Sequence, residues 1–166
     1  MIKKKLLLTS IFFIFFITTS FAKTPLRDEL KNLIRLSDYN IGEKRVLKAI
    51  KYEKKGRYKK SNKLYSQALK YFLLANKQTP ANSNIYFYLG FTSEKLKKIM
   101  DAEIYYSLAL DIDPDNNKIR KSLGTLFVQD NNFDQAKEIL KVLKDCNCEE
   151  YGVLKEIFEK QKILSN

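Results

Sequence analysis

Small and apolar residues recur along the chain at a fixed interval of 34 positions. Ala68, Ala102 and Ala136 keep this interval, as do Gly90 and Gly124. A self-match of this kind is typical of architectures in which each unit is a pair of antiparallel helices, because two helices of about 14 residues and their turns fill about 34 positions. One such pair buries too little apolar surface to fold alone. The pattern therefore predicts an all-α chain of about three stacked helix pairs, a short α-solenoid.

The first repeat fits the interval in two ways. Gly56 lies 34 positions before Gly90, but this frame would bury two lysines, which is unfavourable. A frame that starts seven residues earlier places Ala49 at the position of Gly90 and puts Gly56 in the turn between the helices. Seven residues are close to two helical turns, so the same face is kept. We therefore expect a first helix near Ile41–Lys54 and a long second helix near Tyr58–Gln78.

Amphipathic segments flank the repeats and are expected to cap them. Thr24 and Pro25 are typical of a helix start, and Glu149 and Glu150 complement the positive end of a helix dipole. The predicted organisation is an N-terminal cap at 23–40, repeats at 41–82, 83–116 and 117–148, and a C-terminal cap at 149–166. The apolar faces of the two caps are formed by Leu26, Leu30, Leu33 and Ile34, and by Tyr151, Leu154, Ile157 and Phe158.

The first 22 residues have the pattern of a secretory signal. Three lysines at positions 3–5 precede an apolar run that ends in Ser20-Phe21-Ala22, where small residues stand two places apart. This pattern predicts export to the periplasm or the medium, with Lys23 as the first mature residue. The alternative is an uncleaved anchor in the inner membrane, for which the run is at the short limit.

The chain is basic, with a formal net charge of +12 that falls to +9 when the signal is removed. Such a balance suits nucleic acid, anionic lipid or an acidic protein. Export argues against nucleic acid, and we interpret the lysines and arginines as scattered along solvated helix surfaces. Membrane contact is then at most peripheral.

Histidine and a glycine-rich phosphate loop, on which many enzymes depend, are absent from the sequence, and its many carboxylates form no close pair in an apolar segment. It contains no histidine, and its five glycines form no phosphate-binding loop. This excludes His-dependent hydrolases and zinc sites with imidazole ligands. We therefore expect no enzyme, no cofactor and no metal site.

Cys146 and Cys148 form the one sharp chemical feature of the sequence. The oxidising compartment favours a disulfide between them, whereas a ring closed across a single residue is strained. Two free thiols, or a redox or metal function, remain as alternatives.

The repeat resembles the tetratricopeptide repeat. The resemblance rests on the stretch 86–90 (Tyr-Phe-Tyr-Leu-Gly), on Ala102 and Tyr106, and on the stretch 113–116 (Asp-Pro-Asp-Asn), with a second copy around Gly124. Residues 143–155 also resemble the closing motif of a group of exported alphaproteobacterial tetratricopeptide proteins, in which a cysteine pair precedes Glu-Tyr and a final helix. That resemblance implies a structural disulfide at the last turn.

The resemblance implies binding of a protein or peptide segment in a concave groove lined by the first helix of each pair. Phe87 and Phe91 lie one helical turn apart and form an aromatic pair flanked by Lys118 and Lys121, which suits a segment with apolar and acidic groups. Alternatively, the capping helices cover the two phenylalanines. The predicted groove residues are Asn84, Phe87, Phe91, Glu94, Lys95, Lys118, Lys121 and Thr125, with Val128 and Gln129 further along and Glu43, Val46, Ile50, Glu53 and Lys54 in the first pair.

One variety of this groove holds a C-terminal carboxylate with Lys and Asn one turn apart on one helix, and with Lys and Arg one turn apart on another. In this sequence Lys118 is followed one turn later by Ser122, and Lys121 by Thr125. The carboxylate clamp is therefore not predicted. An envelope-structural or membrane-surface role through the basic surface is the alternative function.

Overall fold

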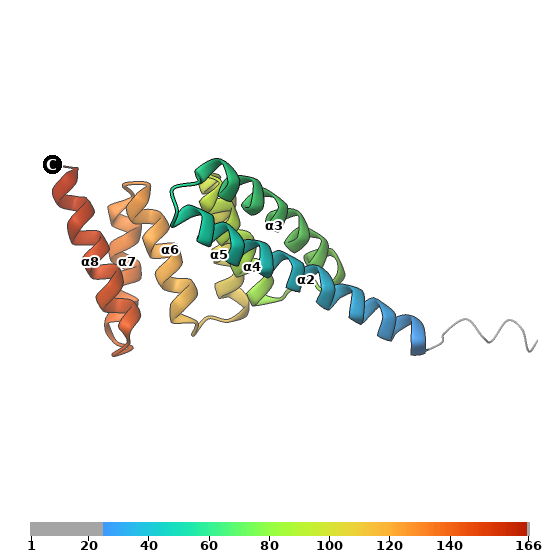
Figure 1. The fold of residues 1–166 in the computed structure, drawn as a ribbon. Coiled ribbons are helices and arrows are strands. Elements are labelled where there is room, and N and C mark those ends of the chain that lie inside the picture. The colour runs from blue at the N-terminus through green and yellow to red at the C-terminus, as the bar shows by residue number, and fades with distance from the viewer. Residues whose placement is uncertain (1–24, 166) are drawn as a thin grey trace, which may run out of the picture. The chain divides into compact units, whose positions relative to one another are not determined.

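The computed structural model describes residues 25–165, and all the regular secondary structure in these residues is α-helical (Figure 1). The signal-like segment 1–22 lies outside the described residues, so its prediction stands untested. The helices are α2 (Pro25–Glu53), α3 (Tyr58–Gln78), α4 (Ser83–Lys95), α5 (Ile99–Ile112), α6 (Asn117–Gln129), α7 (Phe133–Lys144) and α8 (Glu149–Leu164).

The chain divides into two compact units, Met1–Ile34 and Arg35–Asn166. In the first unit the described residues form the start of α2, where Leu30 and Leu33 are 59% and 70% exposed. The expected separation of a capping helix at 23–40 from a first repeat helix near Ile41 is wrong, since α2 runs without a break from Pro25 to Glu53. Around the expected break the sequence contains one glycine, Gly42, and no proline. A single glycine inside a helix costs only about 1 kcal/mol, so it does not end the helix.

The second unit consists of helix hairpins that pack in order. Each of α3, α4, α5, α6 and α7 contacts the next helix along the chain, and α8 lies against both α6 and α7. The part of α2 in this unit packs on α3. The two helices approach closely at Gly42, where an added Cβ would lie 2.9 Å from the ring of Phe72. The predicted long second helix is confirmed, with α3 spanning Tyr58–Gln78.

The turns inside the three hairpins share one geometry. Gly56, Lys97 and Asn131 have the positive φ values 67°, 62° and 58°. At each turn, the amide of this residue donates to the third carbonyl before it, and the next amide donates five residues back, as in Arg57 to Tyr52 at 2.9 Å. This pair of bonds is the Schellman motif that ends a helix. The spacing of the turns, 41 and then 34 positions, confirms that the first repeat follows the shifted frame.

Small residues lie where the helices of a pair approach each other. Ala49, Ala68, Ala102 and Ala136 are all fully buried, at 0% exposure. A Cβ at Gly90 would lie 2.6 Å from Cδ1 of Tyr106, and one at Gly124 would lie 2.8 Å from Cγ2 of Ile139 on α7 and 2.5 Å from Cδ2 of Leu154 on α8. The predicted role of these positions as sites of close helix packing is confirmed.

The C-terminal helix closes the stack as expected. Leu154 is fully buried against Gly124, and the ring of Phe158 meets that of Phe133 edge-on at 5.6 Å. On the same face of α8, Tyr151 and Ile157 are partly buried. The solenoid with a terminal capping helix is therefore present at this end.

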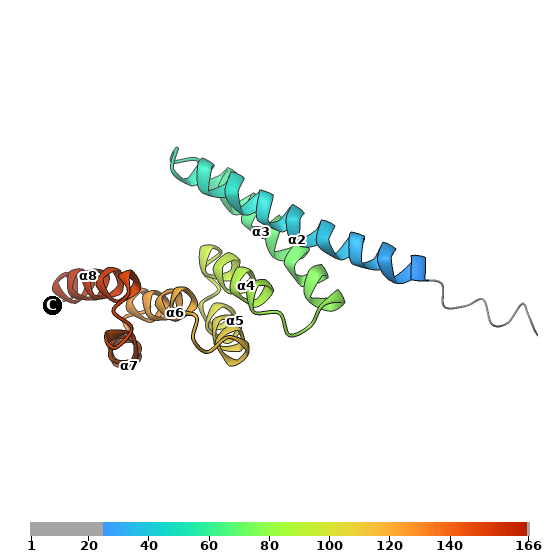
Figure 2. The same ribbon diagram turned by 90° about the horizontal axis from the view of Figure 1, so that it is seen from below.

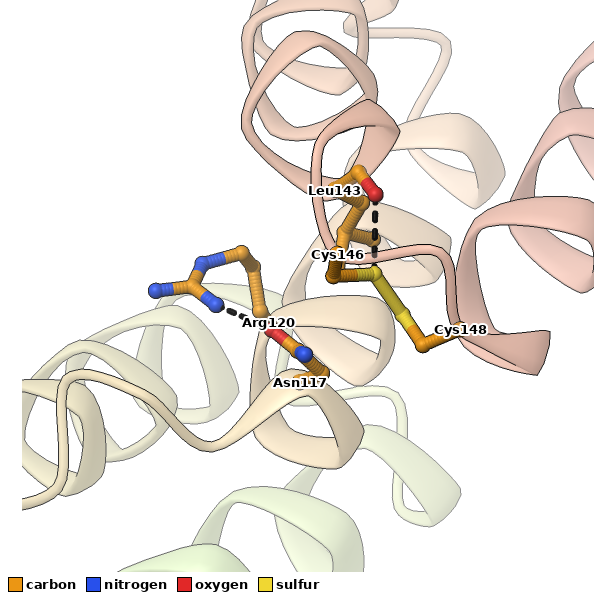
Figure 3. The surroundings of a disulfide bond; sticks show 5 residues. All are labelled: Asn117, Arg120, Leu143, Cys146 and Cys148. Atoms are coloured by element: carbon orange, nitrogen blue, oxygen red, sulfur yellow. Dashed lines mark hydrogen bonds between the residues drawn. A yellow bond between two sulfur atoms is a disulfide. The ribbon is translucent and has the colours of Figure 1, made fainter.

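A disulfide joins Cys146 and Cys148 in the turn between α7 and α8 (Figure 3). Sγ of Cys146 lies 2.9 Å from the carbonyl oxygen of Leu143, at the end of α7. Nearby, the Arg120 guanidinium donates to the side chain of Asn117 at the start of α6. The cysteine pair thus fastens the turn that leads into the closing helix.

Candidate functional site

The main residues predicted to bind a partner lie on the first helix of the second and third hairpins, and those predicted in the first pair lie at the end of α2. Asn84 on α4 and Lys118 on α6 are exposed. The other residues predicted at the centre of the groove on these two helices are partly buried: Phe87, Phe91, Glu94, Lys95, Lys121 and Thr125.

Phe87 and Phe91 form an aromatic pair that rests on the rings of the second helices. Their centroids are 6.4 Å apart and the rings are close to parallel. Phe87 lies 6.0 Å from Tyr106 of α5, and Phe91 meets Tyr65 of α3 edge-on at 6.1 Å. The contact with Tyr106 lies within the second hairpin, the contact with Tyr65 joins it to the first hairpin, and both phenylalanines are only partly buried. The pair is therefore a fixed aromatic platform with part of its surface open.

Glu94 and Lys95, at the end of α4, are already engaged by neighbouring side chains. Glu94 accepts a hydrogen bond of 2.8 Å from the Tyr106 hydroxyl. Lys95 pairs with Glu53 of α2 at 3.1 Å, and its Nζ lies 5.7 Å from the centroid of the Phe91 ring. Lys95 is thus neutralised by Glu53, which ties α4 to α2, and Glu94 is held by the Tyr106 hydroxyl.

A tyrosine–glutamate hydrogen bond is repeated in the first two hairpins. The Tyr65 hydroxyl donates to Glu53 at 2.6 Å, and Tyr106 donates to Glu94 with the same spacing of 12 residues. Burial and the carboxylate acceptor raise the pKa of both tyrosines well above its usual range. Burial also opposes ionisation of Glu53, but the hydrogen bonds from Tyr65 and Lys95 outweigh it and lower the pKa of Glu53. Glu53 is therefore held charged, and hydrogen bonds hold both carboxylates in place.

The Lys95–Glu53 ion pair and Glu94 border a polar hollow where the first helices end. Its volume is about 320 Å³, and two carboxylates, two lysines and two glutamines line it. Gln129 of α6 donates to Glu94 at 3.5 Å across it. Acidic and basic groups are balanced here, so the hollow offers hydrogen bonds without a net charge. The lining residues are Glu53, Glu94, Lys95, Lys97, Gln129 and Gln161.

Two apolar residues predicted to meet a partner are instead in the core. Val46 is 3% exposed and Val128 is 1% exposed. Val128 stands 34 positions after Glu94, and Leu140 stands 34 positions after Tyr106. The third hairpin thus replaces the tyrosine–glutamate pair by two apolar residues, and its first helix is packed against α8. The prediction that these valines line a groove is wrong.

An exposed apolar ridge on α5 was not predicted. Met100, Ile104, Leu108 and Ile112 are 79%, 57%, 36% and 42% exposed and stand four positions apart. The first two correspond, at the spacing of 41 positions between the first two turns, to Lys59 and Lys63 of α3. Apolar residues at every fourth position lie on one face of a helix, and this pattern in the sequence would have identified the surface on α5.

Two further properties concern the described part of the chain. Among residues 25–165, no cluster of three or more potential metal ligands is present. Over the same residues, no helix has the length and apolar character needed to cross a membrane.

Solved structures similar to this chain are tetratricopeptide-repeat proteins. The first such domain of Spaghetti (RPAP3), solved bound to the HSP90 peptide SRMEEVD, is 20% identical, with a TM-score of 0.54 over 77% of this chain and 96% of that one. A tetratricopeptide repeat protein from Parabacteroides merdae is 15% identical, with a TM-score of 0.51 over 74% of this chain and 60% of that one. The Arabidopsis OM64 domain is 18% identical, with a TM-score of 0.49 over 74% of this chain and 98% of that one. No family model and no curated protein matches the sequence.

Proposed function

We propose that this chain, whose fold is that of tetratricopeptide-repeat proteins, is an exported adaptor that holds a segment of another protein against α4 and α6. The observation that carries the proposal is the half-open aromatic platform of Phe87 and Phe91. Aromatic rings fixed by packing lose little conformational freedom when a partner binds them. We infer no catalytic activity, because the sequence has no histidine and no phosphate-binding loop.

The proposed partner segment carries an apolar side chain followed by an acidic group. The apolar side chain packs on Phe87 and Phe91. Lys118 and Lys121, on the neighbouring helix α6, then supply the positive charge, since Glu94 and Lys95 are already engaged. The bound peptide of the Spaghetti domain contains acidic residues, but its recognition is not carried over to this chain, because the lysine, asparagine and arginine pattern of the carboxylate clamp is missing.

The test is recovery of partners from the host with the doubly substituted protein Phe87→Ala, Phe91→Ala. We expect binding to fall by roughly tenfold or more, as for an aromatic pair at the centre of an interface. A matched control is Met100→Lys, Ile104→Lys, which replaces two exposed apolar residues of α5 by those that α3 carries at the corresponding positions, Lys59 and Lys63. Loss of partners from the control and not from the platform variant would place the interface on α5 and refute this site.

The export part of the proposal rests on the sequence of residues 1–22 alone. A second candidate function, at the surface of the envelope membrane, is favoured by one observation, a local concentration of positive charge on the first hairpin.

A further inference from the structure

Positive charge is concentrated in one short stretch of the chain, contrary to the even scatter expected from the sequence. Residues 44–60 hold nine of the 31 lysines and arginines and a single acidic residue, Glu53. This stretch covers the last turns of α2, the turn itself and the start of α3 (Figure 2). A helix hairpin thus presents most of the excess charge of the protein at one end.

The charged residues surround a hollow beside this turn, with a volume of about 550 Å³. No acidic residue is among those described as lining it. Its wall is mostly apolar and includes Leu47 and Tyr52, and Nζ of Lys60 lies 5.8 Å from the centroid of the Tyr52 ring. The lining residues are Leu47, Lys48, Lys51, Tyr52, Lys55 and Arg57.

Glu53, the one carboxylate of the stretch, is bound to residues outside this hollow. Glu53 accepts from Tyr65 at 2.6 Å and pairs with Lys95 at 3.1 Å. It therefore borders the polar hollow near α4 and does not line the basic one. An anion in the basic hollow would face an apolar wall and four cationic side chains, with no carboxylate among the described lining residues.

Apolar and amphipathic side chains stand out beside these cations. Leu47 is 64% exposed, and so is Tyr58, which follows Arg57 at the start of α3. Lysine and arginine beside an exposed tyrosine and leucine are the combination that settles at the interface between lipid headgroups and acyl chains.

We propose that this hollow, the basic hairpin tip lined by Lys48, Lys51, Lys55 and Arg57, binds the phosphate headgroup of an anionic phospholipid at a membrane surface. Leu47 and Tyr58 enter the interfacial layer beside it. The contact is peripheral and independent of the Phe87 platform, so one protein can hold a partner segment while it rests on a bilayer.

A lipid fits this tip better than an acidic peptide does. The backbone amides of Lys54, Lys55, Gly56 and Arg57 all donate to carbonyls within α2, at 2.9 to 3.1 Å. The turn therefore offers no free backbone amide at these positions to fix the register of a peptide chain. What remains for an anion are flexible cationic side chains, which suit a headgroup phosphate that needs no register.

The test is sedimentation of the exported protein with vesicles. We expect binding to vesicles of mixed phosphatidylglycerol and phosphatidylcholine, none to pure phosphatidylcholine, and a steep loss with added salt. Substituting Lys48, Lys51, Lys55 and Arg57 together by glutamine should weaken binding by roughly a hundredfold or more, since each cation near such a surface contributes about 1 kcal/mol. Leu47→Ser alone should weaken it several-fold.

A control variant with the same change of charge separates a site from general attraction. Lys141, Lys144, Lys160 and Lys162 are exposed on α7 and α8, and their replacement by glutamine should leave vesicle binding within about threefold. Equal weakening by the two quadruple variants would overturn the proposal, as would failure of the unaltered protein to bind anionic vesicles. Soluble polyglutamate or glycerol phosphate that competes fully at low concentration would assign the tip to an acidic peptide or a free anion instead.

Discussion

At the scale of single residues, the structure depends on places where no side chain fits. Gly90 faces the ring of Tyr106, which is fully buried and held by its hydroxyl bond to Glu94. The ring has no room to move away from an added methyl group, whose carbon would lie 2.6 Å from it. A glycine is therefore required at position 90 for packing, and this is independent of backbone strain.

We predict that Gly90→Ala lowers the free energy of unfolding by about 1–3 kcal/mol, the range for overpacking a filled core. Gly152 in α8 is the matched control, because nothing lies within 4 Å of a Cβ built there. Gly152→Ala should raise stability by up to about 1 kcal/mol through helix propensity. Urea unfolding followed by circular dichroism measures both changes. Equal effects at the two positions would show that the close approach of α4 and α5 is wrong.

The sequence predicts these small positions but not the hydrogen bonds around them. The spacing of Gly90 and Ala102 identifies a close helix contact because only small residues permit it. The hydrogen bond from Tyr106 to Glu94 joins side chains of two different helices. The repeat pattern does not predict which polar side chains of neighbouring helices come into contact. The same holds for Val128, whose burial depends on how α8 packs on α6.

At the scale of elements, the hairpin turns share a geometry that the residues satisfy unequally. All three need a residue with positive φ, and only the first uses glycine, which adopts it without a steric cost. Asn131 tolerates this conformation, whereas Lys97 is strained by its Cβ. The turn after α4 is therefore the least favourable of the three in its local backbone energy.

We expect Lys97→Gly to stabilise the protein by up to about 1 kcal/mol and Gly56→Ala to destabilise it by about 1 kcal/mol. Lys98, with a φ of −92°, is the control. Its replacement by glycine gains nothing from the turn and should be neutral or unfavourable. Thermal unfolding of the three variants checks the order. A gain from Lys98→Gly equal to that from Lys97→Gly would contradict the turn assignment.

The elements themselves are largely predictable from the sequence, with one instructive exception. The ends of α3 and the start of α8 follow from Gly56, Pro80 and the acidic pair at 149 and 150. The break expected near position 40 does not occur in α2. Proline ends a helix because it removes a backbone hydrogen bond and clashes with the preceding turn. Polar residues or an isolated glycine weaken a helix only slightly, so α2 continues through position 40.

At the scale of the whole molecule, each hairpin of the second unit, Arg35–Asn166, carries a different kind of surface. The first hairpin carries the basic tip, the second carries the aromatic platform, and the third is closed by α8. The repeat pattern predicts the scaffold because each hairpin obeys the same packing rule. It predicts the surfaces poorly, because outward positions such as Met100 and Ile104 are free to differ from one repeat to the next.

The most direct measurement of the central proposal is site-specific photo-crosslinking in the living host. A photoreactive amino acid is placed at Asn84, exposed beside the platform, and in a second strain at Gln135, exposed at the start of α7. We predict a discrete crosslinked partner from position 84, absent from position 135 and lost when Phe87→Ala and Phe91→Ala are added. A crosslink from 84 that survives the two alanine substitutions, or one equally strong from 135, would contradict binding at the aromatic platform.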